Sequence, residues 1–100
     1  MTVRVIGRMT VDPAAVDKLF SERKDDFIAV HDAAVEAGAR HHEFLSDGDG
    51  VLILDEWDTA EHFQQFFANQ PKIGELMASA GVTAPPQFSF YEIMDSPDKF

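Results

Sequence analysis

The segment Val51–Phe67 constrains the fold more than any other part of this chain, because an apolar strand runs directly into a capped helix. Its first part, VLILDEW, has the composition of a strand, and Asp58 or Thr59 then supplies an N-cap for the helix that follows. The preceding turn, Asp47–Gly50, reads DGDG and is typical of a hairpin, because glycine tolerates positive φ. The strand Val51–Trp57 is therefore expected to pair with the strand before it.

The other elements complete a βαββαβ order. We expect strands at Val3–Thr10, Ala39–Ser46 and Gln87–Met94, one helix from Asp12 to Gly38, and a second helix from residue 58 to Gly81 that kinks and restarts at Pro71. This order predicts an α+β, ferredoxin-like fold, with a four-stranded antiparallel sheet and two helices on one face. We expect residues 1–94 to form a single domain and residues 95–100 a C-terminal tail.

Pairing across the hairpin turn predicts which side chains share a face of the sheet. One face is expected to pair Ser46 with Val51, Phe44 with Ile53, His42 with Asp55 and Arg40 with Trp57; the other pairs Leu45 with Leu52, Glu43 with Leu54 and His41 with Glu56. Both faces carry large apolar side chains, whereas a sheet with one face in water alternates more cleanly. The pattern therefore predicts that a second, symmetric copy of the chain covers the second face.

Composition excludes several kinds of function. There is no cysteine, so disulfides and thiolate chemistry are excluded, and no cluster of histidines and acids predicts a metal site. The net charge of −10 disfavours nucleic acid and anionic membrane as partners. No apolar run is long enough for a signal peptide or a membrane span, so we expect a cytoplasmic protein.

The run EWDTAE at Glu56–Glu61, followed by Phe63 and the pair Phe66-Phe67, resembles the antibiotic biosynthesis monooxygenase-like group of dimeric α+β barrels. The architecture is similar over residues 2–94. The resemblance implies a homodimer with a pocket for a small apolar or aromatic ligand between each sheet and its helices. It also implies a cofactor-independent monooxygenase that acts on an aromatic or polyketide-like substrate.

Two alternatives remain open beside this interpretation. A non-redox cyclase or isomerase would need only a histidine base and a shaped apolar pocket, and a dimeric ligand-binding protein would need no catalytic group. The haem-degrading branch of the group is similar to this chain at Trp57 but departs from it elsewhere. It has a tryptophan where Phe66 stands and a haem-ligating histidine near Leu76, so haem degradation is disfavoured.

The candidate catalytic residues are His31, His42 and Asp55. Asp55 is expected opposite His42, and a histidine–carboxylate pair fixes the ring tautomer and raises its basicity, as a catalytic base requires. Cross-strand pairs of this kind also simply stabilise sheets, and the same two interpretations apply to His41 with Glu56. His31 lies on the apolar side of its helix, where a structural role competes with that of a general base.

The candidate substrate-binding residues are Arg23, Phe27, Trp57, Phe63, Phe66 and Tyr91. Arg23 interrupts an apolar stripe, where it either pairs with Asp55 or Glu56 or anchors an anionic group of a ligand. Tyr91 is the single phenol and a candidate hydrogen-bond donor.

Overall fold

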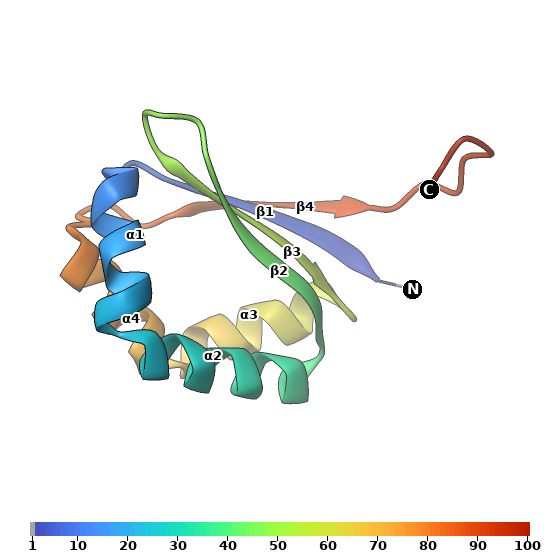
Figure 1. Cartoon of the computed structure of the whole chain (residues 1–100). Helices are drawn as coiled ribbons and strands as arrows, with labels where there is room; N and C mark the ends of the chain where they lie inside the picture. Colours follow the sequence, from blue (N-terminus) through green and yellow to red (C-terminus); the bar gives the residue numbers. More distant parts are fainter. Residues whose placement is uncertain (1) are drawn as a thin grey trace.

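A computed structural model of the chain describes residues 2–100, so residue 1 of the expected domain lies outside it. The elements are β1 (Val3–Met9), α1 (Pro13–Glu22), α2 (Lys24–Ala37), β2 (Ala39–Ser46), β3 (Val51–Trp57), α3 (Ala60–Asn69), α4 (Pro71–Ala80) and β4 (Gln87–Glu92). In this described part, four antiparallel strands form one sheet in the order β2-β3-β1-β4, with the helices on one side (Figure 1). This is the predicted α+β, ferredoxin-like architecture.

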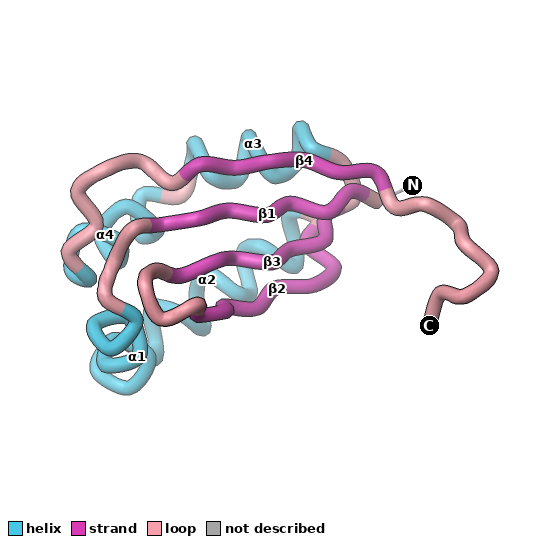
Figure 2. The backbone as a smooth tube through the Cα atoms, turned by 90° about the horizontal axis from the view of Figure 1, so that it is seen from above, coloured by secondary structure: helices cyan, strands magenta, loops and turns pink. Residues whose placement is uncertain are grey.

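The two faces of the sheet have different surroundings. The inner face, which the helices cover, carries Val5, Gly7 and Met9 of β1, His42 and Phe44 of β2, Ile53, Asp55 and Trp57 of β3, and Phe88 and Phe90 of β4. The outer face carries Ile6, Leu45, Leu52, Leu54 and Tyr91 together with charged residues. Figure 2 looks onto the outer face, with the strands in front and the helices behind them.

The core lies on the inner face. Val5, Trp57 and Phe63 form one buried cluster, and a second cluster forms around Val51 near the hairpin end of the sheet. Gly7 leaves room for an aromatic ring, because a Cβ atom there would lie 2.5 Å from Cε1 of Phe88. Burying aromatic side chains of this size is the main source of stability in a small domain.

The hairpin register is confirmed at six of its seven expected pairs, from His41 with Glu56 to Ser46 with Val51. The exception is Arg40, which was expected opposite Trp57. Ala39 takes that place, because the register shifts between Ala39 and His41. Such a bulge redirects a side chain, and the guanidinium of Arg40 binds Asp58 through Nε–Oδ1 at 2.6 Å and Nη2–Oδ2 at 3.3 Å.

The first helix is divided into two, whereas the sequence predicted a continuous helix from Asp12 to Gly38. Arg23 leaves helical geometry at φ −122° and ψ 32°, and α2 then starts in a new direction (Figure 1). Asp25 and Asp26 occupy the first turn of α2, where negative charge stabilises a helix N-terminus. The pair of acids was the sequence signal for this second start.

The second helical region follows the prediction, with Thr59 as the N-cap of α3 and a restart at Pro71. The last strand ends at Glu92, two residues earlier than expected. The chain beyond it runs away from the sheet, so residues 93–100 form a projecting tail (Figure 1). Within residues 2–100, no helix combines the length and apolar character needed to cross a membrane.

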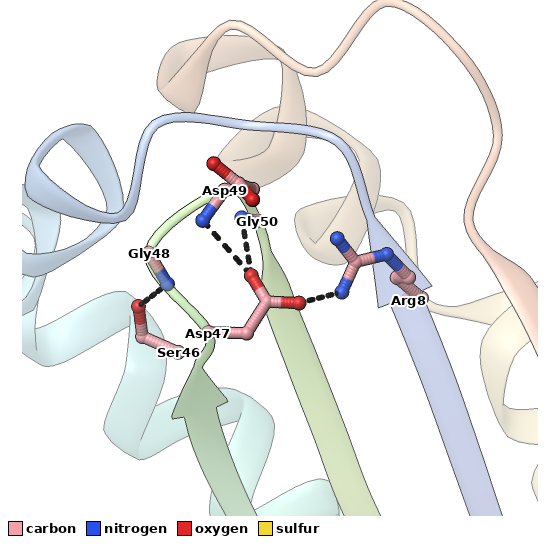
Figure 3. A network of polar contacts seen from close by, with 6 residues as sticks. All are labelled: Arg8, Ser46, Asp47, Gly48, Asp49 and Gly50. Atoms are coloured by element: carbon pink, nitrogen blue, oxygen red, sulfur yellow. Dashed lines mark hydrogen bonds and ion pairs between the residues drawn. The ribbon is translucent and has the colours of Figure 1, made fainter.

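Two side chains hold the β2–β3 turn, the hydroxyl of Ser46, which accepts from the N–H of Gly48 at 3.2 Å, and the carboxylate of Asp47 (Figure 3). Oδ1 of Asp47 accepts hydrogen bonds from the backbone N–H groups of Asp49 at 2.9 Å and Gly50 at 2.8 Å, and Oδ2 forms an ion pair with Arg8 of β1. The Arg8 hydrogen bond, followed by the backbone contacts, lowers the pKa of Asp47 below its ordinary value. The turn is thereby tied to the neighbouring strand.

This network predicts an acid-dependent stability. Because the pKa of Asp47 is lowered in the folded state, its contribution is complete above the ordinary carboxyl value of about 3.9 and is lost as pH falls through the lower, folded-state pKa. We expect Asp47→Asn to reduce the free energy of unfolding at pH 7, and the difference from the parent protein to vanish in strong acid. Asp49→Asn, which removes the same charge from the same turn, is the control. Urea unfolding of the three proteins across pH checks this, and equal losses for both variants would contradict it.

Candidate functional site

A cavity of about 570 Å³ lies between the inner face of the sheet and the helices. Its volume falls within the range of small-molecule sites, roughly 300–1,000 Å³. Side chains of all four described helices line it, and most of them are aliphatic or aromatic. Its polar lining residues, in the part of the chain that the structure describes, are His31, Arg40, His41, His42 and Asp55.

His42, Asp55 and Trp57 form a hydrogen-bonded chain in the wall of this cavity. Nδ1 of His42 lies 2.6 Å from Oδ1 of Asp55, and Nε1 of Trp57 donates to Oδ2 of Asp55 at 3.1 Å. The Asp55 side chain is 7% exposed and that of His42 is 44% exposed. A deeply buried carboxylate therefore supports a ring that remains accessible.

The local sequence explains why these groups meet. Residues 55 and 57 are two apart on β3, so their side chains project from the same face. His42 is the direct cross-strand partner of Asp55, which brings the third group to the same point. Aromatic rings pack against both ends of this hydrogen-bonded group. Phe44 packs edge-on against His42 at a centroid distance of 4.9 Å, and Phe63 packs against Trp57 at 5.6 Å.

This arrangement is suited to proton transfer. An ionised carboxylate only accepts hydrogen bonds, so His42 donates to it through Nδ1–H. Nε2 then carries the lone pair, and Asp55 is in place to stabilise the imidazolium that forms when Nε2 takes a proton. The apolar surroundings strengthen that electrostatic interaction relative to water.

The other predicted site residues divide into two groups. Phe27, Phe63 and Phe66 line the cavity, as does His31, whose side chain is 68% exposed and lies 2.9 Å from Asp32. Two candidates lie elsewhere. Tyr91 is on the outer face and is 52% exposed.

Arg23 is the second candidate outside the cavity lining. Its expected partners were Asp55 or Glu56, but Nε instead binds Oδ2 of Asp26 at 2.6 Å, and Nη1 donates to Ser79 of α4 at 3.2 Å. The break between α1 and α2 explains the difference, because it turns the arginine toward α4 rather than toward the sheet.

His41 also has a partner other than the expected one. Although it lies opposite Glu56 in the register, its Nε2 is 3.6 Å from Glu43 of the same strand. Glu56 is engaged by Arg4 at 3.3 Å and by the hydroxyl of Thr2 at 2.8 Å. The neighbouring strand β1 competes for Glu56, and a hairpin considered alone could not reveal that competition.

Helix α2 is attached to the rest of the site by apolar and polar contacts, since Phe27 packs against Phe20 and Phe44 while acidic side chains bind cations. Within Lys24–Ala37, all of which is described, no residue is fully buried. Asp26 accepts hydrogen bonds from Arg23 and, at 2.9 Å, from Lys72 of α4. The Lys72 hydrogen bond is the largest cause of a lowered pKa of Asp26, followed by that of Arg23. These contacts keep α2 over the cavity without filling it.

Several cavity residues were not among the candidates. Phe44 and Phe88 lie on the inner face of the sheet, and Phe20 and Phe67 come from α1 and α3. The alternation of side chains in the strands signals the first two, because Phe44 is two residues from His42. No group of three or more histidine, aspartate or glutamate side chains in residues 2–100 has the arrangement of a metal site.

Comparison with solved structures shows what this architecture is similar to. SnoaB of Streptomyces nogalater, a cofactor-independent oxygenase, superposes with a TM-score of 0.65 at 14% identity over 98% of each chain. The chain has the fold of the antibiotic biosynthesis monooxygenase-like proteins. An antibiotic biosynthesis monooxygenase gives a TM-score of 0.64 at 12% identity, over 93% of this chain and 99% of that one.

A monooxygenase from the gene ActVA-Orf6 of Streptomyces coelicolor, in complex with the ligand nanaomycin D, shares the monooxygenase-like fold at a TM-score of 0.62 and 20% identity. It matches over 95% of this chain and 88% of that chain. No protein-family model and no curated protein sequence matches this chain. At these identities the likeness establishes the fold.

Proposed function

We propose that this protein is a cofactor-independent monooxygenase of an aromatic or polyketide-like substrate, with His42 as the general base. The observation that carries the proposal is the hydrogen-bonded chain of His42, Asp55 and Trp57 in the wall of an otherwise mostly apolar cavity. Similarity in fold to SnoaB and to the ActVA-Orf6 monooxygenase supports the same reaction class.

The reaction uses oxygen as the oxidant and the substrate as the reductant. Nε2 of His42 removes a proton from a methylene carbon between two aromatic rings, and Asp55 stabilises the imidazolium. The carbanion transfers one electron to oxygen, and the resulting radical pair combines to form a C–O bond. The imidazolium returns its proton to the peroxide, and loss of water leaves a ketone. The sum is R₂CH₂ + O₂ → R₂C=O + H₂O.

The cavity contributes binding and orientation to this sequence. Phe27, Phe63 and Phe66 supply an apolar wall that orients a planar substrate. Because this wall excludes water, the negative charge of the carbanion is poorly solvated, and transfer of an electron to oxygen is favoured. Net charge on the protein, at −10, is consistent with a substrate that enters neutral and is deprotonated only beside His42.

We propose further that the protein acts as a homodimer. The outer face leaves Leu45 and Tyr91 exposed beside Ile6, Leu52 and Leu54, and a second copy is the occupant that matches it. The face carries charges of both signs, since Arg4 and Glu56 lie on it, so that a symmetric copy brings complementary groups together.

Oxygen uptake tests the function directly. With dihydroxyanthrone as the probe, we expect oxygen consumption equal to the anthraquinone formed, with one isotopically labelled oxygen atom incorporated from labelled gas. A cyclase or isomerase would convert a suitable probe to an isomer without oxygen uptake. Recovery of the bound probe unchanged, with no uptake above the protein-free rate, would contradict the proposal and favour a binding protein.

A further inference from the structure

We infer that Trp57 is a positioning residue, whose indole N–H holds Asp55 and through it sets the tautomer of His42. This inference rests on the proposed role of His42 as the base. It assigns to the tryptophan a role other than direct hydrogen bonding to a substrate, because its one N–H donor is already engaged by Asp55 at 3.1 Å.

The two oxygens of the Asp55 carboxylate have different partners. Oδ2 accepts from Nε1 of Trp57 at 3.1 Å, and Oδ1 lies 2.6 Å from Nδ1 of His42. Contacts on separate oxygens fix the rotation of the carboxyl plane. The indole therefore determines where Oδ1 lies, and Oδ1 determines which nitrogen of His42 carries the hydrogen.

The Asp55 carboxylate has no third side-chain partner among the described residues. Asp55 is buried, and among the described residues its side-chain partners are His42 and Trp57. The other titratable or charged residues that line the cavity are His31 of α2 and Arg40 and His41 of β2. The cavity-lining residues of α1, α3 and α4 are apolar.

These remaining groups are engaged elsewhere. Arg40 is committed to Asp58, His31 lies against Asp32, and His41 lies against Glu43. A buried polar atom without a partner is costly. Loss of the indole N–H would therefore leave Oδ2 unpaired and free the carboxyl group to rotate.

The indole of Trp57 is held by close packing. Trp57 is 2% exposed and packs against Phe63, at a centroid distance of 5.6 Å, and against Phe66, at 5.3 Å. Rotation of the ring away from Asp55 would disturb both aromatic contacts. The donor therefore remains directed at Asp55, as a positioning residue requires.

The single tryptophan makes a clean test possible. Production in a tryptophan auxotroph supplied with benzothienylalanine replaces only this N–H by sulfur and nearly preserves the ring shape. Nitrogen NMR of the histidine rings, with His42 assigned from the His42→Asn variant, then reports the tautomer. We expect the Nδ1–H form to predominate in the parent protein and its population to fall by about twofold or more in the sulfur protein, since free imidazole side chains favour Nε2–H.

The same auxotroph supplied with 5-fluorotryptophan gives the matched control, because this analogue alters the ring but keeps the N–H. We expect the Nδ1–H form to persist in the fluorinated protein. An unchanged tautomer in the sulfur protein would overturn the inference, and so would an equal change in the fluorinated protein, which would show that the altered ring rather than the lost N–H is responsible. Should the sulfur protein not fold, Asp55→Asn supplies the reciprocal test. It should shift the indole N–H resonance of Trp57, and an unmoved resonance would overturn the inference.

Turnover of dihydroxyanthrone separates this inference from the proposed function. If both hold, kcat of the sulfur protein falls while KM changes by less than about threefold, because the apolar wall is retained. Absence of turnover in every protein, together with the tautomer change, would reject the monooxygenase and leave the positioning role supported. Unaltered turnover with an unaltered tautomer would reject the positioning role and leave the monooxygenase supported.

Discussion

Replacing His42 with asparagine is expected to lower the turnover of dihydroxyanthrone by about 10²–10⁴-fold, the usual contribution of a general base. Asparagine keeps an N–H donor for Oδ1 of Asp55, so the buried carboxylate retains a partner and the fold is preserved. What the variant loses is the nitrogen lone pair. Initial rates of oxygen uptake, compared with the protein-free rate, measure the effect.

His62→Asn is the control for this variant, because it makes the same chemical change on the exposed side of α3. We expect its turnover to equal that of the parent protein. Circular dichroism of all three proteins should be the same. If His42→Asn keeps turnover within a few-fold of the parent, histidine-based catalysis is wrong and the bound substrate reacts with oxygen without a protein base.

The strands and the hairpin register could be predicted from the sequence, because strand patterns and turn chemistry depend on residues that are close together in the chain. The Asp47–Gly50 turn determines the register, and the register determines that His42 and Asp55 meet. The hydrogen bond between Asp55 and Trp57 was also within reach, since residues two apart in a strand share a face. The shared face of His42, Asp55 and Trp57 follows from the sequence, but the rotation of the indole N–H toward the carboxylate depends on the packing of Phe63 and Phe66.

The positions that could not be predicted depend on competition between distant elements. A continuous helix would direct Arg23 toward the sheet, whereas the break in that helix gives it Asp26 and Ser79 as partners. Arg40 is displaced by a bulge, and Glu56 is taken by β1 rather than by His41. Tyr91 belongs to a strand whose register depends on β1, so its face could not be derived from the hairpin alone.

The second large effect concerns the outer face, where we expect Leu54→Arg to convert a dimer of about twice 11.1 kDa into a monomer. Leu54 lies between Ile6 of β1 and Glu43 of β2, in the middle of the outer face. A symmetric interface contains the change twice. A loss of about 2 kcal/mol for each copy, typical of a central interface residue, weakens the dimer by roughly 10³-fold.

The monomer should remain folded, because the new guanidinium lies opposite Glu43 and points away from the core. Ile28→Arg, on the exposed side of α2, adds the same charge to an exposed apolar position away from the sheet and should leave the dimer intact. Light scattering at micromolar concentration distinguishes the two masses. A monomeric parent protein would contradict the dimer outright, whereas a dimer that survives Leu54→Arg would show that the two copies meet elsewhere. In that second case the apolar side chains of the outer face would need another explanation. Neither result would affect the cavity, because it lies between the sheet and the helices of a single chain.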